Sequence, residues 1–173
     1  LGASARQWVG VDFLAAYLRD ARARRRLAPG TTLAAAQAGQ LPFADAAFDV
    51  VIRAQNTLGL LGEQKLPTVQ EAVRVTRPGG RALFVLYSEF SLVPRAEWYM
   101  QMHRRGLMAI LDWSRSTLEL MVTEDGHASG CFRRRSLEEL FRAAGLTPRI
   151  QRLGDIYWVV QVQRNSSQEG TGQ

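Results

Sequence analysis

The sequence predicts an α/β fold with a mostly parallel sheet that helices cover on both faces. Segments of strand character alternate with segments of helix character along the 173 residues, and such alternation is typical of parallel sheets. The early strand segments are apolar almost throughout, as expected for strands buried on two faces. Two consecutive strand segments near the C-terminus predict one antiparallel strand near an edge of the sheet.

Three strands and two helices are expected in the first half of the chain. "WVGVD" (residues 8–12) is short, apolar and β-branched, which is typical of a buried strand, and a Pro-Gly pair ends the helix after it. "TTLAAAQ" (31–37) indicates a weak strand, and "FDVVIRA" (48–54) indicates a strongly apolar one. "LPTVQEAVRVT" (66–76) predicts a helix with Pro67 in its first turn, where the missing N–H does no harm.

The second half is expected to hold three further strands, two helices and a hairpin. "RPGG" (77–80) is interpreted as a turn into the strand "RALFVLYS", and a helix is expected over residues 93–108. "TLELMVTEDGHASGCFRR" predicts a hairpin, because the Asp-Gly pair at 125–126 favours a tight turn. "SLEELFRAAG" predicts a helix opened by a capping box at residues 136–139. "TPRIQRLG" and "IYWVVQVQR" are expected to be the last two strands.

Composition narrows the class of protein. No apolar run approaches the length that spans a bilayer, no signal segment is seen, and Cys131 is the only cysteine, which favours a cytoplasmic protein without a membrane partner. The net charge of +6 comes almost wholly from arginines; nucleic-acid binding predicts arginines clustered with interleaved aromatic residues, whereas the densest arginine runs here lie at helix ends and are interpreted as solvated faces, so a nucleic-acid partner is not expected. His103, His127 and Cys131 are not spaced as metal ligands. Residues 1–164 are expected to form one domain, and the polar stretch 165–173 to be disordered.

Polar residues follow the expected parallel strands. Ligands of such sheets bind beyond the carboxyl ends of the strands, which places Asp12, Gln37, the loop 53–56 and Tyr87 on one rim. An acid in the position of Asp12 can accept hydrogen bonds from two ribose hydroxyls. The alternative is that Asp12 caps the helix that follows it.

Three motifs carry a resemblance to a known family. "VGVDFLAAYLRDAR", "LPFADAAFDVVI" and "VTRPGGRALFVLY" follow one another in the order and at the intervals seen in class I S-adenosylmethionine-dependent methyltransferases. The chain resembles in particular the group that includes the ubiquinone-biosynthesis C-methyltransferases. The resemblance covers Trp8 to Tyr87 and implies a Rossmann-like sheet, mostly parallel with one antiparallel strand near the edge. "NTLGLL" and "AEWYMQMHRRG" are similar to a bacterial subgroup that methylates small molecules.

The resemblance implies S-adenosylmethionine as the cofactor and assigns residues to it. Asp12 would bind the ribose hydroxyls, and Phe13 and Leu14 would lie against the adenine ring, which favours an apolar surface. Gln37 and Ala38 stand where the family has an Asp and a small residue at the adenine amino group. Gln37 departs from that pattern, although its carbonyl can still accept the hydrogen bond. The residues that would line the methionine end and the methyl-transfer site are Arg53, Ala54, Gln55 and Asn56.

The resemblance also implies methyl transfer to a small-molecule acceptor by direct displacement, in which catalysis is largely proximity and orientation. Tyr87, Trp98 and Tyr99 are candidates for the acceptor pocket, although the aromatic residues on the helix can equally be core. His103 is the candidate general base, because its ordinary pKa suits that task at neutral pH. The alternative is that His103, beside two arginines, is a solvated surface residue.

The family's glycine-rich loop has no counterpart in this sequence. In dinucleotide-binding units of this kind the loop lies about 20 residues before the acid, whereas eleven residues precede Asp12. We therefore expect an N-terminally truncated sheet, with parallel strands at Trp8–Val11, Phe48–Arg53 and Arg81–Tyr87 and a gap between the first two. A missing segment or a partner would complete the sheet, and the chain alone is expected to bind the cofactor very weakly.

Three interpretations of this absence stay open. The chain can come from an incomplete gene or be part of a longer methyltransferase, in which case the complete protein is the enzyme. It can be a degenerate methyltransferase-like domain that serves as a structural subunit of a larger assembly. It can also be a nucleotide-binding or reductase-like Rossmann domain that shares only the acid, although nicotinamide-binding domains do not need the "LPF…FDVV" and "RPGG" motifs.

Overall fold

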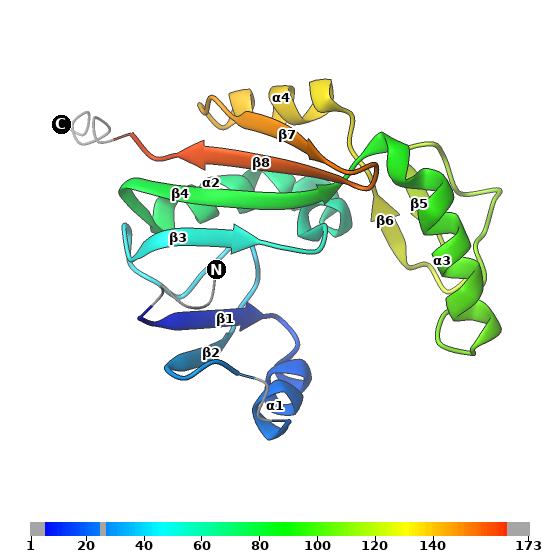
Figure 1. Ribbon diagram of the computed structural model, residues 1–173, viewed down its shortest axis with the longest axis horizontal. Coiled ribbons are helices and arrows are strands. Elements are labelled where there is room, and N and C mark those ends of the chain that lie inside the picture. The colour runs from blue at the N-terminus through cyan, green and yellow to red at the C-terminus, as the bar shows by residue number, and fades with distance from the viewer. Residues whose placement is uncertain (1–5, 25–26, 166–173) are drawn as a thin grey trace.

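The computed structural model describes residues 6–24 and 27–165, and its strands form three separate sheets (Figure 1). The strands are β1 (Trp8–Asp12), β2 (Thr31–Ala35), β3 (Phe48–Arg53), β4 (Thr76–Tyr87), β5 (Leu120–Val122), β6 (Ala128–Gly130), β7 (Arg149–Leu153) and β8 (Tyr157–Gln163). The α-helices are α1 (Ala15–Ala23), α2 (Lys65–Val75), α3 (Leu92–Arg104) and α4 (Arg134–Ala143). Three short 3₁₀ helices are η1 (Thr57–Leu60), η2 (Gly62–Gln64) and η3 (Glu89–Ser91).

The parallel part of the sheet is interrupted between β1 and β3. Strand β1 pairs with β2 in parallel, and β3 pairs with β4 in parallel. Within the described residues no strand pairs with the other edge of β1 or of β3, although the two strands point the same way in Figure 1. The expectation of parallel strands with a gap between the first two is confirmed.

Strand β8 is the expected antiparallel strand. It lies between β4 and β7 in the order β3-β4-β8-β7 and runs antiparallel to both neighbours. The hairpin β7–β8 therefore closes one side of the sheet, with β7 at its edge. The hairpin expected around residues 125–126 is also present, as the antiparallel pair β5–β6.

One face of the four-stranded sheet carries the main core. Alternate residues of β4 and β8 are buried there, among them Phe84 and Val160. Helices α2 and α4 cover this face: Phe84 packs edge-to-face on Phe141 of α4, with ring centroids 5.0 Å apart, and Val69 and Ala72 of α2 join the same cluster.

The opposite face of this sheet differs from the expectation of helices on both faces. Val50 and Ile52 of β3 remain 47% and 37% exposed, and their direct partners on β4 are Arg81 and Leu83. In the part of the chain that the structure describes, no helix packs over these side chains. Apolar strand residues of this kind predict a covered face, and this expectation is not met within the described residues.

Two local predictions were wrong. The "RPGG" segment is not a turn between elements but lies inside β4, where the five-residue step from Thr76 to Arg81 faces the two-residue step from Phe48 to Val50. The capping box at residues 136–139 is absent because α4 begins at Arg134, two residues before Ser136, and its N-cap Arg133 makes no side-chain bond. The polar tail lies outside the described residues except for Asn165.

Replacing Gly80 in this bulge with alanine is expected to lower the free energy of unfolding by about 2–3 kcal/mol. A Cβ at this position would lie 2.7 Å from the Asp49 carbonyl oxygen and 2.8 Å from the Arg77 carbonyl oxygen, and neither backbone group can move freely. Gly79→Ala is the control, because a Cβ there meets open space and only the positive φ of 76° is unfavourable, at about 1 kcal/mol. Urea denaturation of both variants checks this, and an equal loss in the two would contradict it.

Candidate functional site

The carboxyl ends of the parallel strands carry the residues predicted to bind ligands. Strand β1 ends at Asp12, β3 ends at Arg53 and β4 ends at Tyr87, while Gln37 follows β2 by two residues. Because β1 and β3 point the same way (Figure 1), these ends lie on the same side of the strands, the side on which α3, β5 and β6 are found. Among the described residues, however, the side chains of Asp12, Gln37 and Asn56 share no hydrogen bond, so their convergence on one cleft stays a prediction.

Asp12 orders the chain between β1 and α1, although the N-cap of α1 is Leu14 and not Asp12. One carboxylate oxygen, Oδ1, accepts a hydrogen bond of 2.8 Å from the backbone N–H of Leu14, the residue before α1. The carboxylate therefore fixes the turn from β1 into α1, while Oδ2 accepts no hydrogen bond from the described residues. Phe13 is 70% exposed and Leu14 is 37% exposed, so an apolar surface lies directly beside the available oxygen.

Arg53 joins the two parallel sheet fragments. Its Nη2 donates a hydrogen bond of 2.7 Å to the carbonyl of Ala38, in the loop after β2. The side chain is half-buried, and burial lowers its pKa from the ordinary value, although a guanidinium remains charged at neutral pH. Its Nε is buried without a hydrogen-bond partner among the described residues. Arg53 was predicted to line the cofactor site, and the structure shows that it also holds the Ala38 loop in place.

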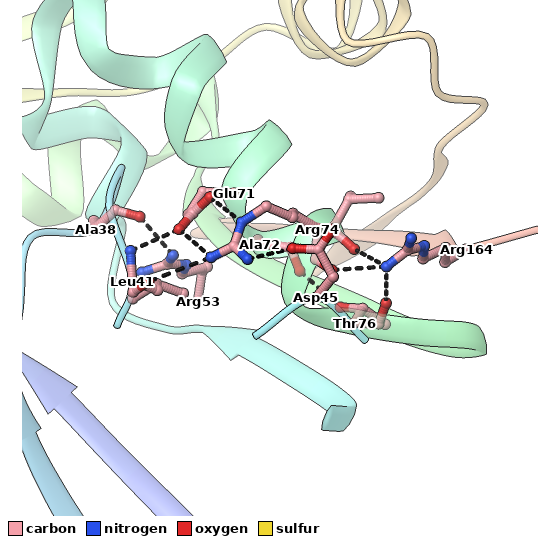
Figure 2. Close-up of polar contacts among 10 residues, drawn as sticks. Ala38, Leu41, Asp45, Arg53, Glu71, Ala72, Arg74, Thr76 and Arg164 are labelled. Carbon is pink, nitrogen blue, oxygen red and sulfur yellow. Dashed lines mark hydrogen bonds and ion pairs between the residues drawn. The ribbon is translucent and has the colours of Figure 1, made fainter. Parts of the chain in front are cut away.

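A network of charged side chains fixes the same loop against α2 (Figure 2). Glu71 accepts hydrogen bonds from the backbone N–H of Leu41, at 2.6 Å, and from the guanidinium of Arg74, at 2.7 Å. Arg74 also pairs with Asp45, and Arg164 donates to the carbonyls of Arg74 and Thr76. Nothing in the sequence singled out Glu71, yet its carboxylate positions the segment that contains Gln37 and Ala38.

Replacing Glu71 with glutamine is expected to lower the free energy of unfolding by about 1–2 kcal/mol at pH 7. The hydrogen bond from Arg74 is the main reason that the pKa of Glu71 lies below its ordinary value. A lowered carboxyl pKa stabilises the folded state above the unfolded-state pKa, and this contribution is lost as the pH falls through the folded-state pKa. Urea denaturation between pH 7 and pH 2.5 should show the two proteins converging at the acid end. Glu63→Gln, at an exposed position, should follow the wild type throughout.

Two consecutive residues after β3 have strained backbone conformations. Gln55 and Asn56 have φ angles of 56° and 61°, in the left-handed region that non-glycine residues seldom adopt. Such strain persists only where the surrounding structure enforces it, and it is frequent at functional sites. The loop that was predicted to line the methyl-transfer site is therefore held in one specific conformation.

The side chain of Asn56 enforces this conformation. It is 1% exposed, and its Oδ1 accepts a hydrogen bond of 3.0 Å from the backbone N–H of Tyr87. Its Nδ2 donates to the carbonyl of Gly130 at 2.8 Å and to the hydroxyl of Ser129 at 3.3 Å. Asn56 thus connects the ends of β3 and β4 with the hairpin strand β6, and all its side-chain hydrogen bonds are made within the protein.

The candidate acceptor residues fall into two groups. Tyr87 is half-buried at the end of β4 and stacks on Tyr157 with ring centroids 5.4 Å apart. The centroid of its ring lies 4.2 Å from the guanidinium carbon of Arg95. Burial is the main reason that the pKa of Tyr87 lies above its ordinary value. Tyr99 is 4% exposed in a second core cluster, whereas Trp98, which packs edge-to-face on it, is 48% exposed.

His103 lies on α3 at the end away from Arg95, the residue of this helix that contacts Tyr87. It occupies the last turn of the helix, where its Nδ1 is 3.1 Å from the carbonyl oxygen of Met108. Arg95, which contacts Tyr87, is eight residues earlier, and this corresponds to about 12 Å along a helix axis. The structure therefore gives His103 no contact with Tyr87 or with the loop of Asn56.

No helix among the described residues is long and apolar enough to cross a membrane.

The comparisons with known proteins agree with the sheet topology. Residues 1–80 match the family model of a methyltransferase domain, while no curated protein matches the chain. A SAM-dependent methyltransferase from Methanosarcina mazei is 18% identical over 91% of this chain and 81% of its own, with a TM-score of 0.63. The 1,6-didemethyltoxoflavin-N1-methyltransferase of Burkholderia thailandensis, solved with 1,6-didemethyltoxoflavin and S-adenosylhomocysteine, is 18% identical over 91% of this chain and 61% of its own, with a TM-score of 0.60.

A third similar structure is an S-adenosylmethionine-dependent methyltransferase from Clostridium acetobutylicum. It is 13% identical over 93% of this chain and 76% of its own, with a TM-score of 0.62. At these identities, the similarity to solved structures establishes the fold.

Proposed function

We propose that this chain, which has the class I S-adenosylmethionine-dependent methyltransferase fold and a matching methyltransferase domain over residues 1–80, transfers a methyl group to a small-molecule acceptor. One observation carries the proposal. Asp12 ends a parallel strand with one carboxylate oxygen available, and the exposed apolar side chains of Phe13 and Leu14 follow it directly. A nucleoside presents the matching pair of features, a diol and a flat apolar base.

The residues at this edge fit S-adenosylmethionine. Oδ2 of Asp12 would accept hydrogen bonds from the ribose hydroxyls, and Phe13 and Leu14 would cover the adenine. The side-chain carbonyl of Gln37 would accept from the adenine amino group beside Ala38. Arg53 and Gln55, at the end of β3 and in the loop after it, would lie toward the methionine end of the cofactor. When bound, the cofactor supplies a methyl group on a positively charged sulfur.

The protein's own contribution to the reaction is positioning. A displacement of this kind gains most from fixing the acceptor atom in line with the methyl group. The strained loop at Gln55 and Asn56, which is tied to the end of β4 and to β6, provides a fixed wall on the side of β3. Tyr87 provides a neutral aromatic surface on the side of β4. The proposed reaction relies on positioning and assigns the role of a strong base to none of the described side chains near this wall.

We also propose that a further strand lies between β1 and β3 in the functional protein. The facing edges of these strands leave backbone N–H and C=O groups unpaired in the described residues, and such groups are costly unless they are hydrogen-bonded or solvated. The glycine-rich loop that would bind the carboxylate and ammonium groups of the cofactor's methionine part also has no counterpart in this sequence. Loss of several such hydrogen bonds weakens binding by orders of magnitude. The chain of 173 residues is therefore expected to bind the cofactor weakly, and a form with the additional strand to bind it tightly.

A titration with S-adenosylhomocysteine, followed by ¹H–¹⁵N NMR, tests the proposed cofactor site. Millimolar ligand should shift the amide signals of residues 12–14 and 37–38, and should leave those of α4 unchanged. NMR detects weak binding, so the expected low affinity does not obscure the result. If no signal at this edge responds, the cofactor assignment fails and the structural-subunit interpretation is favoured.

A further inference from the structure

A buried arginine that has no counter-ion among the described residues lies next to the proposed acceptor side of the sheet. Arg95, in the first turn of α3, is only 5% exposed. Its Nη2 donates two hydrogen bonds of 2.9 Å, to the carbonyl and to the hydroxyl of Ser129 on β6. Its Nε and Nη1 are buried and have no hydrogen-bond partner among the described residues. Three N–H groups of a charged side chain are therefore left unpaired.

The neighbours of Arg95 do not neutralise it. None of the ion pairs that the described residues form includes Arg95. Ser129 is neutral, and burial raises the pKa of the nearby Tyr87 and Cys131, which keeps both of them uncharged at neutral pH. The ring of Tyr87 lies over the guanidinium and offers a cation–π contact, but such a contact offsets only part of the cost of burying an unpaired charge.

The position of Arg95 connects it with the proposed site of methyl transfer. The hydroxyl of Ser129 accepts hydrogen bonds from both Arg95 and Asn56. Asn56 belongs to the strained loop at the end of β3, and Tyr87, whose ring Arg95 contacts, ends β4. Arg95 therefore contacts the end of β4 directly, through Tyr87, and is linked to the loop after β3 through the hydroxyl of Ser129. A buried arginine that serves only to hold two elements together would be expected to have its donors satisfied.

On these grounds we infer that Arg95 recognises the methyl acceptor, and that the acceptor carries an anionic oxygen group such as a carboxylate. This inference rests on the proposed function, because it takes the carboxyl edge as the acceptor site. The unpaired donors of Arg95 supply the charge-assisted hydrogen bonds that such a group needs. Access to Nη1 requires a shift of the side chains that cover it, and the half-buried ring of Tyr87 is the one in contact with the guanidinium.

Benzoate is a suitable probe, and benzamide is its neutral match. In NMR titrations at constant ionic strength, benzoate should bind the wild type saturably and shift the signals of residues 87, 95 and 129, while benzamide should not. Arg95→Met, which keeps the length of the side chain without its charge, should bind benzoate about 10- to 100-fold more weakly. Arg104→Met, an exposed arginine on the same helix, is the matched control and should bind benzoate as the wild type does.

Three outcomes overturn the inference: no saturable binding of benzoate to the wild type, equal binding of benzoate and benzamide, or equal binding of benzoate to Arg95→Met and the wild type. A merely structural Arg95 predicts the last of these together with a lower Tm. If Arg95→Met does not fold, the Nε–H signal of Arg95 in the wild type, assigned with Arg95→Lys, must shift with benzoate.

A parallel titration with S-adenosylhomocysteine separates the two proposals. Arg95→Met should bind it as the wild type does, because Asp12 and Phe13 are on another strand and its loop. If the wild type binds benzoate but not S-adenosylhomocysteine, the proposed function fails while the anion site stands. If it binds S-adenosylhomocysteine but not benzoate, the cofactor site stands and the inference about Arg95 fails.

Discussion

Replacing Asn56 with alanine is expected to lower the free energy of unfolding by about 3–4 kcal/mol. The substitution leaves the part-buried backbone N–H of Tyr87 and carbonyl of Gly130 without their partner, at about 1–3 kcal/mol for each group. Alanine also tolerates the φ of 61° less well than asparagine does, which adds about 1 kcal/mol. Urea denaturation monitored by tryptophan fluorescence measures the loss.

Two further variants separate the causes of this loss. Asn56→Asp keeps the acceptor for the N–H of Tyr87 but places a carboxylate oxygen against the Gly130 carbonyl, so it should be as destabilising as alanine. Thr57→Ala removes only the exposed hydrogen bond to the carbonyl of Ala54, and it should change the free energy by less than about 1 kcal/mol. A wild-type stability in Asn56→Ala would show that the loop does not depend on this side chain.

Gly59 is also needed for the contact between Asn56 and β6. A Cβ on Gly59 would lie 2.2 Å from Nδ2 of Asn56 and 2.7 Å from the carbonyl oxygen of Gly130. Only glycine allows η1 to approach β6 closely enough for Asn56 to bond to it. The loop after β3, the helix η1 and the hairpin are therefore one packed unit, and the stability of that unit sets the geometry of the proposed methyl-transfer site.

Replacing Asp12 with alanine is expected to weaken binding of adenosine and of S-adenosylhomocysteine about 10- to 100-fold. Charge-assisted hydrogen bonds to two ribose hydroxyls contribute about 1.5–3 kcal/mol each, and part of this is recovered by water. Adenosine is informative because it lacks the methionine part, so its affinity reports on the ribose and adenine contacts alone. NMR titration or isothermal titration calorimetry gives the dissociation constants.

The control for Asp12 is another acid in the same region. Asp20 lies on α1 in an exposed ion pair with Arg24, and Asp20→Ala should leave both affinities unchanged. The wild type should also discriminate against 2′-deoxyadenosine, and Asp12→Ala should lose that discrimination. If Asp12→Ala changes stability but not the affinity or the discrimination, the carboxylate only fixes the turn to Leu14.

The local pattern of the sequence was sufficient for most of the fold. Apolar strands such as "FDVVIRA" and "IYWVVQVQR" have one dominant way of burying their side chains, so β3 and β8 lie where they were expected. The antiparallel pairing of β8 also followed from the order of the elements, whereas the gap beside β1 was expected from the family resemblance and its missing glycine-rich loop. The residues at strand ends could be named because parallel strands bring their carboxyl ends together.

Only the tertiary structure decided which of these side chains are buried and which partners they bind. The hydrogen bonds of Asn56 reach residues more than 70 positions later in the chain, and no local pattern predicts a partner at that separation. Arg95 is one of many arginines in the sequence, and only its burial against Tyr87 and Ser129 distinguishes it. The sequence determined the strands because strand formation depends on neighbouring residues. The burial of a polar side chain, and hence its chemistry, depends on elements that meet only in the folded protein.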